Sequence, residues 1–360
     1  MTPLQFSLHS KLEYLRSLVQ HFDRAQPGDR ILLMSMTLEP GDPRIGEVLE
    51  SLEAAAKRGV HVLFSIDARS FLETRRGVPG PLWFTPELSA GSRAPYGALY
   101  GILERLNGYE TCRAVITNRP GRQFTSSVAG RSHIKAAIIN DQVFVGGCNL
   151  DASDKIDLMI SWHDRRTSDD LYELLSRGIT TGNIREALSG VDRTLPLDST
   201  ASLIIDAGVP DQSLILKNAF GLIDAAQKWL VFSCQYFPNS VTAQRLLAAR
   251  KRGVNTRLAY SNIKGFNLIG QAIQHLNRII EHTRLPRDMF KGELPADYPF
   301  LHAKLIACDQ GVMIGSHNYV LPGVRFGTAE IAFKSSDVEL AKQAAEKLSA
   351  QLRALRKQQS

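Results

Sequence analysis

The chain has 360 residues, a formal net charge of +7 and a sequence pI near 9.2. Its 44% hydrophobic and 22% charged residues are typical of a globular protein, and its length is sufficient for two domains with separate cores. No stretch approaches the roughly 20 apolar residues that a membrane-spanning helix needs. Four cysteines without CxxC spacing are expected to be reduced core residues in a cytoplasmic protein.

The first elements along the chain are predicted from hydrophobic periodicity. Residues 1–25 have apolar residues at helical spacing with charged residues between them, which predicts an amphipathic helix rather than a signal peptide. Residues 29–67 then predict a strand, a loop, a helix and a second strand. The helix should end at Lys57-Arg58-Gly59, because basic residues in the last turn and a glycine just past it terminate helices.

Chemically distinctive residues follow in the next strands. The segment His133-Ile-Lys135 leads into an apolar run and then Gly147-Cys-Asn149, and Asp157 stands in the further run KIDLMISW. Alternation predicts strands, and residues i and i+2 of a strand share one face. We therefore expect His133 and Lys135 to point the same way, with the amide of Asn149 beside them.

The second half of the chain repeats this order. Residues 228–261 predict strand, helix and strand, and the helix ends at Lys251-Arg252-Gly253. A polar segment at 194–202 separates the halves. The second set of distinctive residues is His302, Lys304, Asp309, Gly315, Ser316, Asn318 and Glu330.

The duplication carries the functional interpretation. A single His-x-Lys on a strand is uninformative, but here it occurs twice with matching partners. Lys135 and Lys304 stand in segments that otherwise look buried, where an unpaired ammonium costs several kcal/mol. Two imidazoles, two ammonium groups and two amides are what a symmetric phosphodiester site would need.

The motif His-x-Lys, four residues, Asp, then Gly-Ser-x-Asn resembles the signature of the phospholipase D superfamily. The second copy matches fully, whereas the first has Asn140 in place of Asp and Gly147 in place of Ser. The resemblance covers roughly residues 28–335. It implies an α/β fold of two similar α/β/α halves, residues 1–195 and 203–360, with mixed sheets flanked by helices. It also implies a pseudo-twofold axis, with the site at the interface of the halves.

The resemblance also implies a mechanism. One imidazole attacks phosphorus and the other protonates the leaving alkoxide; the family suggests His133 as nucleophile and His302 as acid, although pseudo-symmetry leaves the reverse order open. Asp157 and Glu330 would hydrogen-bond the far ring nitrogens, and Asp309 has no chemical step. No metal-ligand spacing is found, and no cofactor is expected. The candidate site residues are His133, Lys135, Asn149, Asp157, His302, Lys304, Asp309, Ser316, Asn318 and Glu330.

The substrate class is less closely defined. The segment CQYFPNSVTAQRLLAARKRGV, residues 234–254, resembles cardiolipin synthases, which favours a glycerophospholipid at a membrane surface and a peripheral location. The basic charge equally suits DNA or RNA, so a nuclease is the alternative, and a catalytically silent phosphate-binding scaffold is a third possibility. We expect a monomer, because one chain carries both motifs. The basic loop at 284–300 could cover the site or contact a membrane.

Overall fold

The structure is a computed structural model. It describes residues 4–68, 97–118, 131–151, 153–190, 192–236, 238, 240–261, 301–319 and 327–357. The loop at 284–300 and part of the cardiolipin synthase-like segment lie outside these residues. None of the described helices is both long and apolar enough to cross a bilayer.

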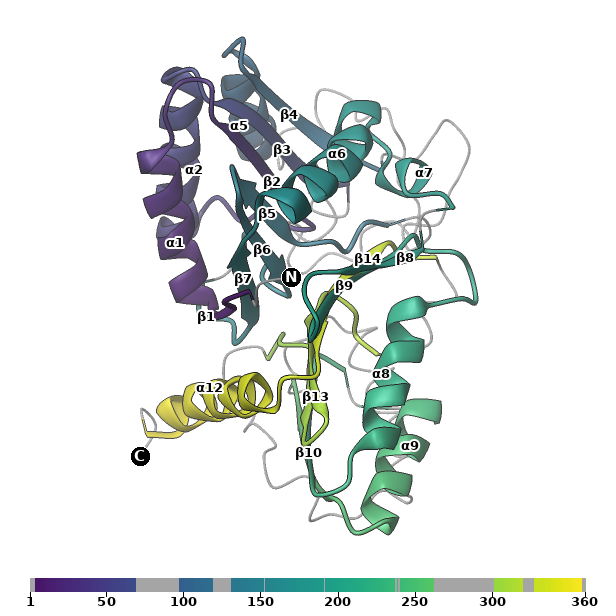
Figure 1. The fold of residues 1–360 in the computed structure, drawn as a ribbon. Coiled ribbons are helices and arrows are strands. Elements are labelled where there is room, and N and C mark those ends of the chain that lie inside the picture. The colour runs from purple at the N-terminus through teal and green to yellow at the C-terminus, as the bar shows by residue number, and fades with distance from the viewer. Residues whose placement is uncertain are drawn as a thin grey trace.

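The first half forms a seven-stranded mixed sheet (Figure 1). Its order is β1-β7-β6-β5-β2-β3-β4; β2, β3 and β4 run parallel, and the other neighbours are antiparallel. The strands are β1 (Ser7–Ser10), β2 (Arg30–Ser35), β3 (His61–Asp67), β4 (Cys112–Thr117), β5 (Ala136–Ile139), β6 (Gln142–Gly146) and β7 (Leu158–His163).

The second half forms another seven-stranded mixed sheet, with the order β11-β10-β12-β13-β14-β9-β8. Among the strands that the structure describes in this half, only β10 and β11 pair in parallel. The strands are β8 (Arg193–Pro196), β9 (Ala201–Asp206), β10 (Trp229–Cys234), β11 (Asn255–Tyr260), β12 (Leu305–Cys308), β13 (Gly311–Gly315) and β14 (Glu330–Ser335). Six strands of each sheet correspond in order and direction, so the expected pair of similar α/β halves with mixed sheets is confirmed.

Helices cover the outer faces of both sheets (Figure 1). Apolar side chains of α1 (Lys11–Arg24), α2 (Pro43–Lys57) and α5 (Gly97–Asn107) form one core with the first sheet. Those of α8 (Leu214–Ala225) and α9 (Ser240–Lys251) form another with the second sheet. Local sequence begins these helices: Ser10 and Glu13 form a capping box before α1, and Asp42 caps α2 ahead of Pro43.

A third core joins the two halves. It combines the facing sides of the sheets with residues of α6 (Arg165–Thr181) and α12 (Val338–Lys357), while the short α7 (Ile184–Ala187) follows α6. Phe6 stacks edge-on against Phe333 at 4.8 Å between ring centroids, and Trp162 packs beside them. Lys347 of α12 also pairs with Glu13 of α1 at 2.6 Å. Because buried apolar surface is continuous across the interface, the halves are held in a defined relation.

Two boundaries differ from the sequence prediction. Residues 7–10, expected within a helix, form the edge strand β1, because pairing with β7 supplies hydrogen bonds that local periodicity does not reveal. Residues 193–196 form β8, which pairs with β9 in the second sheet. The division expected after residue 195 therefore falls inside that pairing, and the change from one sheet to the other comes before Arg193.

Candidate functional site

The two motif histidines lie next to each other, and each takes its carboxylate from the opposite half. His133 Nδ1 is 3.0 Å from both carboxylate oxygens of Glu330, and His302 Nδ1 is 2.6 Å from Asp157 Oδ2. The imidazole centroids are 6.4 Å apart with an interplanar angle of 72°. The sequence leaves open which imidazole each acid meets, and the structure shows an exchange between the halves.

Backbone hydrogen bonds across the interface position both imidazoles. The N–H of His133 donates to the carbonyl of Ala329 at 2.8 Å, and the N–H of His302 donates to that of Ile156 at 2.8 Å. In each case, the residue that accepts the hydrogen bond stands immediately before the acid of the other half. The motifs were predicted to lie within strands, but β5 begins at Ala136 and β12 at Leu305. The residues just before those strands pair across the interface instead.

The motif lysines are buried beside the histidines. Lys135 Nζ donates to the carbonyl of His133 at 2.7 Å, and Lys304 Nζ donates to that of His302. Burial, with the neighbouring Lys304 second, lowers the pKa of Lys135 to about 7. Burial lowers the pKa of Lys304 to about 8. Because the charge of Lys304 lowers the pKa of Lys135, an anion such as a phosphate group bound near both lysines would stabilise their charged forms.

The two motif asparagines follow β6 and β13. The side-chain oxygen of Asn149 accepts the N–H of Met36 at 3.2 Å, which turns its amide nitrogen to the opposite side. Asn318 is half-buried, and its backbone carbonyl accepts a hydrogen bond from Cys234 Sγ at 2.7 Å. Both asparagines therefore lie in the loops that follow these strands, and their role in phosphate binding stays a prediction.

Gly147 in the first motif and Ser316, its counterpart in the second, support the carboxylates in different ways. Ser316 Oγ donates to Glu330 Oε2. At Gly147, an added Cβ would overlap Asp157 Oδ1. The glycine of the first motif therefore makes room for the carboxylate that bonds His302, while the serine of the second motif donates to the carboxylate that bonds His133.

Asp309 lies apart from the other candidate site residues. It follows the end of β12 remote from Lys304, roughly 16 Å away along an extended chain. Its Oδ1 accepts the backbone N–H groups of Gln227, Lys228 and Trp229. Asn140, its counterpart, accepts the N–H of Arg30 at 3.1 Å in the same manner. The structure thus gives this motif position an anchoring contact between strands in both halves.

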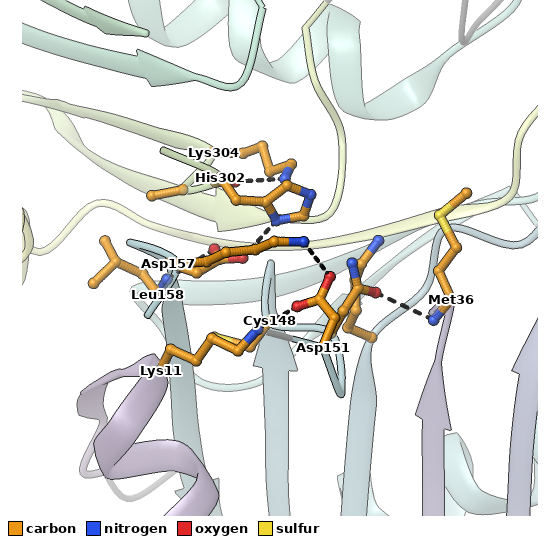
Figure 2. Close-up of polar contacts among 12 residues, drawn as sticks. Lys11, Met36, Cys148, Asp151, Asp157, Leu158, His302 and Lys304 are labelled. Atoms are coloured by element: carbon orange, nitrogen blue, oxygen red, sulfur yellow. Dashed lines mark hydrogen bonds and ion pairs between the residues drawn. The ribbon is translucent and has the colours of Figure 1, made fainter. Parts of the chain in front are cut away.

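Sequence reasoning missed a charged cluster on the His302 side of the site, which Figure 2 shows below Asp157. The buried carboxylate of Asp151 accepts from Lys11, from Lys155 Nζ at 2.6 Å and from Thr37 Oγ1 at 3.0 Å. Burial opposes ionisation of Asp151, but the two lysines hold its pKa well below the ordinary value. Lys155 stands two residues before Asp157, yet no repeat in the sequence distinguishes it from a surface lysine.

A second buried ion pair positions the segment that leads into His133. Asp67 closes β3, and its Oδ1 accepts from Arg131 Nη1 at 3.1 Å. Its Oδ2 accepts the N–H of Ser132 at 2.9 Å and the amide of Asn118 at 2.7 Å. Asp67 therefore fixes the backbone immediately before the histidine.

The carboxylates of the two histidine–carboxylate pairs have pKa values shifted in opposite directions. Burial, followed by the charge of Lys304, lowers the pKa of His302 to about 3 although Asp157 opposes the shift. Burial would raise the pKa of Asp157, but His302 and Lys304 bring it below the ordinary value. Burial raises the pKa of Glu330. Within the described residues, no cluster of three histidine, cysteine or acidic side chains is arranged to hold a metal ion.

The chain was compared with known families and structures. Residues 220–352 match the family described as "Cardiolipin synthase, PLD-like domain". Phosphatidylserine synthase of Haemophilus influenzae Rd KW20 has a similar structure, with a TM-score of 0.69, 14% identity, and coverage of 98% of this chain and 86% of that one. Polyphosphate kinase of Porphyromonas gingivalis is also similar, with a TM-score of 0.56, 13% identity, and coverage of 97% and 50%. No curated protein matches the sequence.

These matches confirm the resemblance to the phospholipase D superfamily. The fold is the two-sheet α/β architecture that the motifs implied, and it extends over nearly the whole chain. The segment 220–352, which matches the phospholipase D-like family model, contains His302, Lys304 and Glu330.

Proposed function

We propose that the protein is a phosphodiesterase or phosphatidyltransferase that acts on glycerophospholipids through a phospho-histidine intermediate. The observation that supports this most directly is the exchanged pairing of two adjacent imidazoles with two carboxylates, above two buried lysines. Each imidazole donates Nδ1–H to a carboxylate, which leaves Nε2 as the reactive nitrogen.

The residues divide the chemistry between charge stabilisation and proton transfer. Lys135, Lys304 and the amides of Asn149 and Asn318 would surround the phosphate oxygens, where negative charge develops in the transition state. One imidazole attacks phosphorus, and the other protonates the leaving oxygen. The second imidazole then deprotonates water or an acceptor alcohol, which displaces the phosphoryl group from nitrogen. Water gives hydrolysis and an alcohol gives transfer.

A lipid substrate is supported by the comparisons and by charge. The matched family carries cardiolipin synthase in its description, and the structural neighbour is a phosphatidylserine synthase. A net charge of +7 favours contact with an anionic lipid surface. A cytoplasmic protein that binds the membrane peripherally would meet such a substrate at the bilayer surface.

The test is an assay on mixed phospholipid vesicles in EDTA, with added alcohol, and on single-stranded and duplex DNA. We expect phosphatidic acid, or a phosphatidyl-alcohol, from the wild-type protein and none from His133→Asn or His302→Asn. The matched control is His163→Asn, an exposed histidine at the end of β7, which should keep full activity. Cleavage of DNA with lipid untouched would contradict the proposal, as would strong inhibition by EDTA that a divalent ion reverses.

A further inference from the structure

An ammonium group that belongs to neither motif lies on the His302 side of the site. Lys155 stands two residues before Asp157, whose carboxylate bonds the ring of His302. The carbonyl of Ile156, between them, accepts the backbone N–H groups of His302 and Ala303 at 2.8 and 3.0 Å. Lys155 is therefore adjacent in the chain to the two residues that fix the backbone and the ring of this histidine.

A buried carboxylate holds this ammonium group in place. Lys155 Nζ donates to Asp151 Oδ2 at 2.6 Å, and Thr37 Oγ1 donates to the same oxygen at 3.0 Å. The other oxygen of Asp151 accepts from buried Lys11. Asp151 itself stands two residues after Asn149. The position of the Lys155 ammonium group is therefore fixed from a residue next to one of the candidate site loops.

The three charged side chains of this cluster carry one more positive charge than negative. Burial opposes ionisation of Asp151, but the two lysines hold its pKa well below the ordinary value, so one carboxylate faces two ammonium groups. Burial is the main cause of the lowered pKa values of His302 and Lys304, and the charge of Lys155 lowers both further. The extra positive charge is thus felt in the site, which Figure 2 shows beside Asp151.

The two lysines that bind Asp151 differ in exposure. The side chain of Lys11 is 2% exposed and that of Asp151 is 7% exposed, whereas that of Lys155 is 22% exposed. A ligand can therefore reach Lys155, while Lys11 keeps the buried carboxylate paired. This arrangement allows an anion to bind Lys155 without the large cost of leaving a buried charge uncompensated.

The second half has no such pair of charges in its sequence. Counted from the motif asparagine and from the histidine-bound acid, the residues that correspond to Asp151 and Lys155 are Val320 and Thr328. Neither side chain carries a charge. A phosphodiester has two different substituents, and two similar motifs do not distinguish them by themselves. A cation on one side of the site does.

We infer that Lys155 forms a second anion-binding subsite, which takes a carboxylate or phosphate group on the alcohol that the phosphatidyl group leaves or joins. The inference rests on the proposed function and names its substrate class: glycerophospholipids or acceptor alcohols whose polar group bears a further negative charge. An ammonium group binds either anion as a point charge. Because the diacylglycerol part carries no charge, the same contact orients the phosphodiester between the two halves.

Two alcohols that differ in charge but little in shape test the subsite. The probes are 3-hydroxypropanoate, which carries a carboxylate, and its neutral amide, with the lipids in micelles of a neutral detergent. In one arm each alcohol accepts the phosphatidyl group of phosphatidylcholine. In the other arm each is already the head group of the lipid that is hydrolysed. We expect kcat/KM to favour the carboxylate by about tenfold in at least one arm, the effect of one charge-assisted hydrogen bond.

The arm that shows the preference identifies the source of the anion, a lipid head group or a free acceptor. Lys155→Met should lower the preference by about tenfold, and Lys155→Arg should retain it because the charge remains. The matched control is Lys347→Met, since Lys347 is also partly exposed and also lies 2.6 Å from a carboxylate, that of Glu13. It should keep the wild-type preference. A wild-type protein without preference in either arm, or an equal preference in Lys155→Met, overturns the inference.

A ligand that cannot react separates this subsite from the chemistry. The probes are 3-phosphonopropanoate and its carboxamide, titrated into the protein by calorimetry. The wild-type protein should bind the carboxylate about tenfold more tightly, and Lys155→Met should not. This comparison in the wild-type protein needs no variant, so it remains decisive even where a variant does not fold. Lipids left intact by a protein that shows this binding preference would overturn the proposed function and support the subsite; absence of both would overturn both.

Discussion

At the scale of single residues, the difference between Gly147 and Ser316 makes a direct prediction. Gly147→Ser would place a Cβ where Asp157 Oδ1 now lies, so the carboxylate would have to turn away from His302. Partners that orient metal-bound histidines typically contribute 10- to 100-fold to activity, and we expect a fall in kcat of roughly that size for this carboxylate–histidine pair. Gly41→Ser, where the added Cβ meets no atom within 4 Å, is the control. Full activity of Gly147→Ser would show that Asp157 does not orient the imidazole.

Asp309 and Asn140 lead to a second prediction at this scale. Because Asn140 makes the equivalent contact with a neutral amide oxygen, Asp309→Asn should retain activity within about threefold. Asp309→Ala should lower the free energy of unfolding by about 0.5–1.5 kcal/mol, because the backbone N–H groups of Gln227 and Trp229 lose an acceptor that water can partly replace. Urea unfolding measures the stability of each variant, and the vesicle assay measures its activity. Inactive but stable Asp309→Asn protein would assign the carboxylate to the chemistry.

At the scale of elements, the end of β3 controls the segment that carries His133. Asp67→Ala removes the partner of buried Arg131 and the acceptor of the Ser132 N–H. Breaking a buried ion pair from one side costs about 3–5 kcal/mol, which we expect as a loss of stability in urea unfolding. Activity should fall further than the folded fraction, because the backbone before the histidine loses its anchor. A variant that is less stable but has normal kcat in its folded fraction would separate the anchor from the site.

At the scale of the whole molecule, the two buried motif lysines make stability depend on pH. The pKa of Lys135 is about 7 and that of Lys304 about 8 in the folded protein, against an ordinary value of 10.5. Between these values the unfolded chain binds more protons than the folded one, so the free energy of unfolding rises with pH from about 7 towards 10. Lys135→Met should reduce this rise and stabilise the protein at pH 7 by roughly 1–4 kcal/mol while abolishing activity.

Urea unfolding at pH 7 and pH 9 measures both effects. Lys347→Met, which removes a partly exposed lysine of α12, is the control and should keep the wild-type pH dependence. Equal slopes in the wild-type protein and Lys135→Met would contradict the lowered pKa of the buried lysine.

The duplicated motifs were sufficient to predict the two α/β halves, because strands with helices between them follow from periodicity and repeat order. They could not predict which carboxylate meets which imidazole, because Asp157 and Glu330 each stand at the start of a strand that borders the interface. Lys11 and Lys155, which bind Asp151, were not identified either. The contact between Lys11 and Asp151 depends on tertiary packing that joins residues more than 100 positions apart, including the pairing of β1 with β7.

The exchange of carboxylates between the halves also bears on how such a chain can evolve. A substitution at Asp157 alters the histidine of the other half, and one at Glu330 alters the histidine of the first. Loss of the acid in one half therefore impairs the histidine of the other half. Substitutions that compensate for such a loss should arise near that histidine, in the opposite half. The two halves must therefore be conserved together, because each supplies the carboxylate that the histidine of the other half needs.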